Sequence, residues 1–327
     1  MHKWTIRLAL VLTFLATTSS LTEGQPRLKM PRIGVFNTGA PSASQYLVDA
    51  FRQGLSEHGY VERQNITIEY RWGEGNPERL PELAAELVRL GVEVILAGGG
   101  DVGVRAAKKA TDKIPIVMAS SADPVRSGHV TSFARPGGNI TGIARMLGEL
   151  STKRLEVLRH SLLGVSRVAV LRDPVTEPLI LQDMERAAKS MSVQLQVVEA
   201  HANEDFQHSF EIATKMRVEA LILLPSAMFH AHRKLLLDLA TKKGLPAMYS
   251  DRVFVEEGGL MSFGTNLARD YRRAAYFVDK ILRGSAPKDL PLERPIRAEF
   301  VINLRAAKEI GLTLPPEVLQ QADKVIR

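Results

Sequence analysis

The sequence of 327 residues contains no cysteine, and this absence excludes several kinds of chemistry together. Disulfides, thiolate metal ligands and a cysteine nucleophile all need that side chain. The lipid-modified cysteine that tethers many exported bacterial receptors is missing as well. We therefore expect a protein that is not lipid-anchored and that is indifferent to an oxidising compartment.

Aromatic residues are also scarce, at 6%, although the formal net charge is +7. A nucleic-acid surface needs basic residues that cluster with aromatic side chains or lie along a reading helix. Here the basic residues are interleaved with acidic ones, and the largest group is Arg269, Arg272 and Arg273. We expect no nucleic-acid partner and interpret the charge as diffuse surface charge that favours solubility.

Long apolar runs are missing too. The run at Leu8–Ala16, interrupted by Thr13, is far shorter than the roughly 20 residues that span a bilayer. Lys3 and Arg7 precede this run, and small polar residues follow it at 17–20. This order is typical of a secretory signal peptide. We predict a signal over residues 1–25 and export to the periplasm, with an uncleaved anchor as the alternative.

Catalytic and metal-binding motifs are few. The sequence has no G-x-S-x-G motif, and its histidines are dispersed. His230 and His232 lie two residues apart on an expected helix, so they diverge by about 200°. We expect surface histidines, no metal site, no cofactor and no enzymatic activity.

One motif leaves an alternative open. Gly98–Gly103 fits G-x-G-x-x-G, and Asp123 follows 25 residues after Gly98. Such a turn can bind a pyrophosphate at a helix N-terminus. However, it follows the third expected strand, whereas the dinucleotide motif follows the first. A nucleotide-dependent enzyme and a tight turn without a ligand both remain alternatives to a ligand-facing loop.

From Pro31 onward, short apolar segments alternate with helical patterns. We expect strands at 32–36, 65–70, 92–97 and 114–119, and then at 168–171, 193–198, 220–224 and 247–249. The expected helices are 44–58, 76–90, 101–110, 149–160, 179–190, 205–216 and 231–243. Nearly continuous apolar strands between helices indicate parallel sheets covered on both faces. Two such arrays predict an α/β protein with two Rossmann-like, doubly wound lobes.

The last third of the chain has a different pattern. A long helix at 266–283, a proline-rich loop, a strand at 297–304 and two short helices are expected there. This segment is too small for a third domain, so we expect it to complete both lobes. Lobe 1 would be 31–143 plus 266–294 and lobe 2 would be 144–265 plus 295–327, with three crossings between them.

Polar loops follow the expected strands at their carboxyl ends, where ligands bind in open α/β sheets. Hydroxyls and free helix-start N–H groups suit a carboxylate, and a buried aspartate suits an ammonium group, so a zwitterion would fit. Each loop by itself could be a plain helix cap. The candidate residues from these loops are Asn37, Thr38, Ser42, Gly98, Gly99, Ser120, Asp123, Ser226 and Asp251.

Three groups of residues resemble one known family. They include NITIEY at 65–70, SFARPGGNITG at 132–142, YSDRVFV at 249–255 and VINLRAAKEIGLTL at 301–314. From Pro31 to the C-terminus, the chain resembles the ABC-transporter substrate-binding family that includes tryptophan/tyrosine-type receptors. It departs from the family pattern at Gly98–Gly100, where many relatives have Thr or Ser and Pro. These glycines predict more room and fewer side-chain donors.

The resemblance implies a type I periplasmic-binding fold, in which two lobes joined by three hinge strands clamp a ligand. It also implies an ABC permease in the inner membrane as the partner. The candidate ligand-binding residues that match family segments facing the cleft are Thr38, Ser42, Ser120, Asp123, Ser226, Tyr249 and Asp251.

These observations together predict a monomeric, periplasmic solute-binding receptor of an ABC importer. It would capture a small polar or zwitterionic ligand, with aromatic amino acids and related compounds among the candidates. Hinge closure would bury the ligand between the lobes. The main alternative is an exported ligand-sensing subunit of a membrane receptor.

Overall fold

The computed structural model describes residues 30–176, 178–295 and 297–327. The predicted signal peptide therefore lies outside the described residues. Residues 31–327 form one compact unit that contains two sheets, each covered by helices. No helix in the described ranges is long and apolar enough to cross a membrane.

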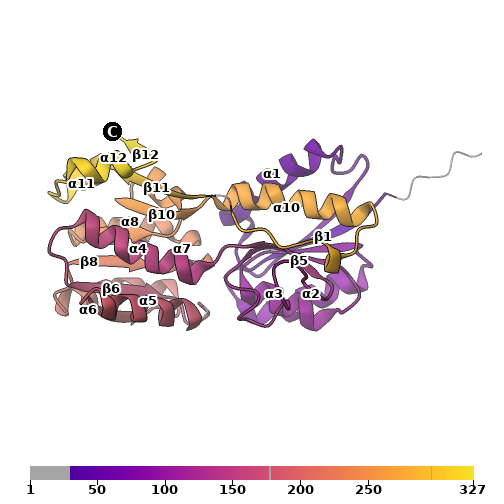
Figure 1. Cartoon of the computed structure of the whole chain (residues 1–327), viewed down its shortest axis with the longest axis horizontal. Helices are drawn as coiled ribbons and strands as arrows, with labels where there is room; N and C mark the ends of the chain where they lie inside the picture. The colour runs from indigo at the N-terminus through magenta and orange to yellow at the C-terminus, as the bar shows by residue number, and fades with distance from the viewer. Residues whose placement is uncertain (1–29, 177, 296) are drawn as a thin grey trace, which may run out of the picture. The chain divides into compact units, whose positions relative to one another are not determined.

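The first sheet has five parallel strands in the order β2-β1-β3-β4-β5. The strands are β1 Arg32–Asn37, β2 Thr67–Trp72, β3 Val94–Ala97, β4 Ile116–Ser121 and β5 Ile140–Ala144. Its helices are α1 Pro41–Glu57, the 3-10 turn Pro77–Arg79, α2 Leu80–Arg89, α3 Asp101–Ala110 and α10 Leu267–Leu282. α10 lies beside α1 in Figure 1, and the two helices pack extensively.

Alternate residues of these strands enter two different cores, because successive side chains of a strand point to opposite faces. Val94 and Leu96 pack with α1 and α10, whereas Ile95 and Ala97 pack with α2 and α3. Both faces are apolar, which explains why the strands read as continuous apolar runs.

The second sheet has seven strands in the order β12-β11-β10-β9-β8-β6-β7. Only the β10–β11 pair is antiparallel among the described strands. The strands are β6 Arg167–Arg172, β7 Gln194–Glu199, β8 Ala220–Leu223, β9 Ala247–Tyr249, β10 Met261–Thr265, β11 Ala298–Asn303 and β12 Lys324–Ile326.

Helices cover both faces of this second sheet as well. α4 Leu147–Ser161, α5 Pro178–Ser190, α11 Leu304–Glu309 and α12 Pro316–Gln321 contribute to one core. The helices of the opposite face are α6 Phe206–Lys215, α7 Ala227–Ala231, α8 Arg233–Lys242 and α9 Arg252–Glu256, with the 3-10 turn Asn203–Asp205 before α6. The predicted pair of doubly wound α/β lobes is therefore confirmed.

The chain passes between the sheets three times. It crosses from β5 to α4, from β10 to α10, and from the segment after the 3-10 turn Pro287–Asp289 to β11. The three-crossing connection is confirmed, and it makes the start of α10 and the start of β11 neighbours.

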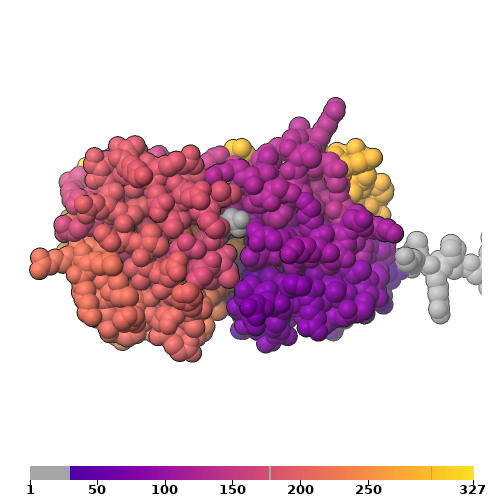
Figure 2. Space-filling view, turned by 90° about the horizontal axis from the view of Figure 1, so that it is seen from below, coloured from indigo at the N-terminus to yellow at the C-terminus, as the bar shows by residue number. Residues whose placement is uncertain are grey.

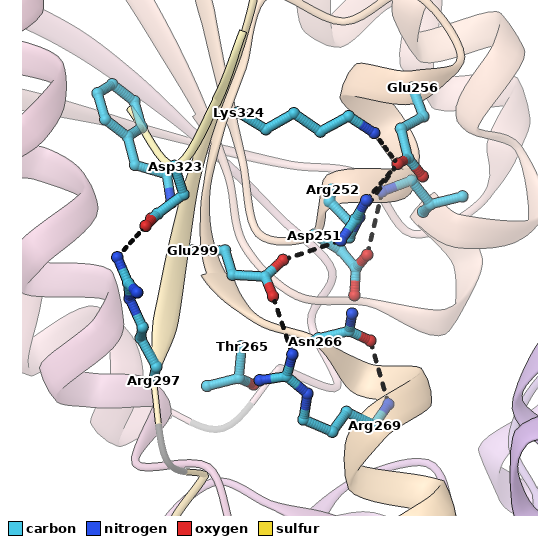
Figure 3. A network of polar contacts seen from close by, with 12 residues as sticks. Asp251, Arg252, Glu256, Thr265, Asn266, Arg269, Arg297, Glu299, Asp323 and Lys324 are labelled. Carbon is cyan, nitrogen blue, oxygen red and sulfur yellow. Dashed lines mark hydrogen bonds and ion pairs between the residues drawn. The ribbon is translucent and has the colours of Figure 1, made fainter. Parts of the chain in front are cut away.

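A network of charged residues joins elements on either side of these crossings (Figure 3). Glu299 of β11 accepts a 3.1 Å hydrogen bond from Arg252 of α9 and lies 3.6 Å from the Arg269 guanidinium of α10. The Asn266 side chain accepts from the Arg269 N–H and caps α10. α10, which packs against the first sheet, is thus linked at its start to strands of the second.

Several predicted elements need correction. β5, β10 and β12 were not predicted, because they are short and the first two contain glycine. The expected helix 231–243 is present as α8, and the short helix α7, which was not predicted, precedes it with His232 between the two. Ser226 caps the start of α7, because its hydroxyl accepts from the Met228 and Phe229 N–H groups.

We predict that Gly54→Ala lowers the free energy of unfolding by about 1–3 kcal/mol, as measured by urea denaturation. A Cβ at Gly54 of α1 would overlap the carbonyl oxygen of Arg272 in α10. Helix propensity alone predicts the opposite sign, a gain of about 1 kcal/mol.

Gly138→Ala is the control, because a Cβ there meets nothing within 4 Å. A Gly54→Ala protein as stable as the parent, or more stable, would contradict this packing.

Candidate functional site

A cavity lies at the carboxyl ends of strands from both sheets, lined by residues of both lobes. Figure 2 shows the groove between early residues, in indigo and purple, and residues of the second lobe, in pink and orange. The cavity has a volume of about 160 Å³. A cavity at this edge is where ligands bind in open α/β sheets.

Five of the candidate residues predicted from the sequence line this cavity. They are Asn37, Thr38, Gly99, Ser120 and Ser226. They lie at the ends of β1 and β4 or in the loops after β1, β3 and β8, so the structure brings four of the five predicted polar segments to one place.

The other five candidates lie elsewhere. Ser42 is exposed on the first turn of α1, and Gly98 is buried behind the cavity wall. Asp123 lines a separate cavity and accepts from the Arg126 N–H. Tyr249 is buried in the core of lobe 2, where it stacks on Phe254 at 4.9 Å. Asp251 is buried beside His230 and caps α9 through the Val253 N–H.

The glycine loop provides close packing and not the extra room that we expected. A Cβ at Gly98 would overlap the hydroxyl of Tyr271, and one at Gly99 would lie 2.5 Å from the Thr38 side chain. Both Gly99 and Gly100 have positive φ, at 79° and 73°. Gly103, the third glycine of the motif, packs α3 against the Gly98 carbonyl. The G-x-G-x-x-G pattern therefore has a structural explanation.

Asp101, at the first position of α3, holds the neighbouring loop. Its carboxylate accepts from the Ser121 hydroxyl at 2.6 Å and the Ala122 N–H at 2.9 Å, and lies 3.3 Å from His129 Nε2. Burial raises the pKa of Asp101, but the hydrogen bonds from His129, Ser121 and Ala122 outweigh burial, and the net pKa is lowered. Asp101 is thus an ionised anchor for the end of β4, which carries Ser120.

The lobe 2 wall is built in a similar way. The Ser226 hydroxyl donates to Asp173 Oδ2 at 2.6 Å and accepts from the Met228 N–H at 3.1 Å. The other carboxylate oxygen of Asp173 accepts from the Val175 N–H. Ser226 therefore caps α7 and orders the loop after β6 at the same time.

Two histidines correct the expectation that the histidines lie on the surface. The His129 side chain is 3% exposed and that of His230 is 16% exposed. Each lies near an aspartate, but no group of three or more possible metal ligands is found in the described part of the chain.

Arg145 joins the first two crossings at the back of the cavity. Its Nε donates to the Thr265 hydroxyl at 2.7 Å, and it lies 3.5 Å from Asp270 Oδ2. Burial raises the pKa of Asp270 to about 6, although Arg145 and a hydrogen bond from Thr265 oppose that shift. Arg145 was not predicted as a cavity residue from the sequence. It follows the short strand β5, which contains glycine and was not predicted as a strand.

Tyr46, Tyr271 and His230 also line the cavity and were not predicted. They lie on helices and not on loops after strands. Tyr271 accepts a 2.9 Å hydrogen bond from the Asn37 amide, although 234 residues separate the two in sequence.

The sequence from residue 33 to residue 326 matches the model of one protein family, the ABC transporter substrate binding proteins. The chain belongs to this family. The resemblance seen in the sequence is thereby confirmed, and the protein is a solute-binding receptor by family.

Individual relatives are more distant. The chain is 22% identical over 265 residues to a tyrosine-binding protein of Clostridioides difficile, covering 80% of this chain and 75% of the relative. Among solved structures, it resembles a conserved domain protein of Vibrio cholerae (23% identity, TM-score 0.84, 91% of this chain and 100% of the other).

A third similar protein is a Streptococcus pneumoniae ABC domain solved in complex with L-Trp (21% identity, TM-score 0.82, 90% of this chain and 99% of the other). At this level of identity the solved structures show the fold, which is the type I periplasmic-binding fold.

We predict that Asp270→Asn changes how stability depends on pH. The folded state keeps the Asp270 proton up to about pH 6, whereas an unfolded aspartate loses it near pH 3.8. The unfolded state therefore binds fewer protons across this window, so the free energy of unfolding falls as pH rises and levels off above it. Removal of the titrating group should abolish a fall of about 3 kcal/mol.

Urea denaturation between pH 4 and pH 7 measures this difference. Asp289→Asn, at an exposed aspartate, is the control. If the free energy of unfolding changed with pH in the same way in the parent protein and in Asp270→Asn, Asp270 would not be the group that causes the fall in stability.

Proposed function

We propose that this protein is the periplasmic receptor of an ABC importer and binds a small ligand that has a polar head and an apolar, aromatic-sized body. The observation that carries the proposal is the cavity at the strand ends, to which both lobes contribute. Polar groups of Thr38, Ser120 and Arg145 line it beside apolar walls that include Leu147 and Ile180.

The relatives support an aromatic amino acid or a related compound. One is named a tyrosine-binding protein, and another was solved with L-Trp. In this proposal Asn37, Thr38, Gly99, Ser120 and Ser226 contact the ligand, and Arg145 supplies positive charge for a carboxylate.

The mechanism is binding without chemistry. The lobes are 31–143 with 266–294 and 144–265 with 295–327, and their closure about the three crossings buries the ligand. The closed monomer then docks on a permease of the inner membrane. We propose that export by the N-terminal signal peptide brings the chain to the periplasm, and that the protein has no enzymatic activity.

Closure is supported by an ion pair across the groove. Arg126, in the loop after β4, donates to Asp183 of α5 at 2.7 Å. Asp183 also contacts Arg186 of its own helix. An exposed pair of this kind contributes about 0–1 kcal/mol, so it can favour the closed arrangement without locking it.

We expect calorimetric titration of the purified protein with amino acids, aromatic acids and sugars to show saturable binding of an aromatic amino acid or related compound, with no product formed. The double variant Thr38→Val, Ser120→Ala should weaken this binding at least tenfold, because two hydroxyls are lost from the cavity wall. Ser190→Ala, at an exposed serine of α5, should bind as the parent does.

Binding of none of these compounds, or steady turnover of any of them, would overturn the proposal. Equal affinity in the double variant would place the ligand outside this cavity.

A further inference from the structure

Arg145 is the only lysine or arginine among the described residues that line the cavity. Part of its guanidinium is used at the chain crossings. Nε donates to the Thr265 hydroxyl at 2.7 Å, and Nη2 donates to the Thr265 carbonyl oxygen at 3.3 Å. Nη1 has no acceptor among the described residues, and it is not one of the fully buried polar atoms. One side of this cation is therefore left for a ligand in the cavity.

Asp270, in the first turn of α10, is the acid that pairs with Arg145. Its Oδ2 lies 3.5 Å from Arg145 Nε, and its side chain is 4% exposed. Among the described residues, its carboxylate accepts one hydrogen bond, which comes from the Thr265 hydroxyl at 3.2 Å. The same hydroxyl accepts from Arg145 Nε, so Thr265 bridges the two charged groups. Asp270 itself is not among the residues that line the cavity.

Hydrogen bonds decide the charge of a buried acid, as a comparison of Asp270 with Asp101 shows. Both residues are almost completely buried. Asp101 accepts from Ser121 and Ala122 and lies beside His129, and its pKa is lowered. Asp270 lacks such a set of donors, and burial raises its pKa to about 6. A carboxylate that gains few hydrogen bonds on burial keeps its proton to a higher pH.

The charged groups around Asp270 come from its own helix and from three other elements. Arg145, which follows β5, and Arg269, on α10, favour the ionised form of Asp270. Asp251, at the start of α9, disfavours that form. Arg154 of α4 is fully buried and lies within electrostatic reach of both Arg145 and Asp251. Burial outweighs these charges, so the net shift of the Asp270 pKa is upward.

Three other ionisable groups lie near Arg145. Burial raises the pKa of the Tyr46 and Tyr271 phenols, which are therefore uncharged at neutral pH. His230 has a pKa that is lowered, mainly by burial, so its ring is neutral at pH 7 and above. Of these three groups, only His230 needs to be distinguished from Asp270 by experiment in the acid range.

A ligand carboxylate at Arg145 would bring a second negative charge to the cation that Asp270 already pairs with. Like charges repel strongly in a buried site, so the ligand and the ionised acid compete for Arg145. A protonated Asp270 removes this competition. By linkage, the bound ligand raises the affinity of Asp270 for its proton by the same factor.

We propose that Asp270 is a positioning residue that acts through Arg145 and couples the capture of a ligand carboxylate to a proton. The receptor binds such a ligand more tightly when Asp270 is neutral. This inference rests on the proposed function, in which Arg145 meets the ligand carboxylate, and it adds a means by which acidity tunes the affinity of the cavity.

The direction of the pH dependence follows from the charge of Asp270. Below about pH 6 the acid is neutral, and binding is tightest. As pH rises through this value the affinity falls, and it levels off where Asp270 is ionised in both the free and the bound protein. An acid that only held Arg145 in place would have the opposite effect, because its protonation would release the guanidinium.

Calorimetric titration between pH 5 and pH 7.5 tests the inference. The probe is the tightest-binding carboxylate among L-tryptophan, L-tyrosine and the aromatic acids, which stay largely ionised over this range. We expect the parent to bind it about five- to tenfold more tightly at pH 5 than at pH 7.5. Near pH 6.5, titrations in two buffers with different heats of ionisation should show uptake of about half a proton per ligand.

Asp270→Asn imitates the neutral acid and still accepts from Thr265. We expect this variant to bind the probe at pH 7.5 about as tightly as the parent does at pH 5, with no pH dependence and no proton uptake. Asp279→Asn is the matched control and should keep the pH profile of the parent. Asp279 is also a buried aspartate of α10 and pairs with Arg283, but it lies about 14 Å further along the helix.

Two further variants assign the effect to individual groups. Arg145→Gln should weaken binding at least tenfold and remove the pH dependence, because the group through which Asp270 acts is lost. His230→Asn keeps a donor for the Ser226 carbonyl, which lies 3.2 Å from His230 Nδ1, and should keep the pH dependence. Thermal unfolding at each pH confirms that the variants are folded.

Every outcome decides between the alternatives. An affinity of the parent that does not change with pH, or weaker binding by Asp270→Asn at pH 7.5, would overturn the coupling while the receptor function stands. Loss of the pH dependence in His230→Asn would assign it to that ring and overturn the role of Asp270. Binding of sugars alone would also refute the coupling. If no compound binds at any pH, the proposed function fails and the coupling fails with it.

Discussion

The structure depends on where the chain crosses between its two sheets. Parallel strands present all their carboxyl ends at one edge, and the crossings bring two such edges together. Arg145 follows β5 and bonds to Thr265 at the end of β10, so one buried side chain joins two of the three crossings. The cavity is a consequence of this arrangement, because its walls are the loops that the crossings place opposite one another.

Polar and ionisable side chains are buried at the crossings and around the cavity. Their burial has an energetic cost that the family's function can explain. Asp270 is kept in an environment that disfavours its charge, and Tyr46 and His230 keep polar atoms unpaired within the described protein. A protein selected for stability alone would satisfy or replace such groups. A receptor that must recognise a polar head can instead leave them for the ligand to satisfy.

The sequence alone was sufficient for the architecture, because buried parallel strands and amphipathic helices have different periods. It failed where elements were short or rich in glycine, as at β5 and β10. Thr38 and Ser120 could be predicted because their position at or directly after the carboxyl end of a strand places them at the cavity edge. Tyr46, Tyr271 and His230 could not, because they reach the cavity from helices, and only the packing of distant segments brings them there.

The glycine motif shows a related limit. G-x-G-x-x-G is compatible with phosphate binding, but the space beside Gly98 is taken by Tyr271 from α10, more than 150 residues later in the chain. The role of the motif therefore depends on the side chain that packs against it in the folded protein, and the spacing of the glycines alone does not predict that role.

A crystal structure of the protein with its tightest-binding ligand tests the central claim most directly. The account predicts a ligand in contact with both lobes, with its polar groups within hydrogen-bond distance of Thr38, Ser120 and Arg145. A ligand that touches one lobe only, or that binds outside this cavity, would contradict it.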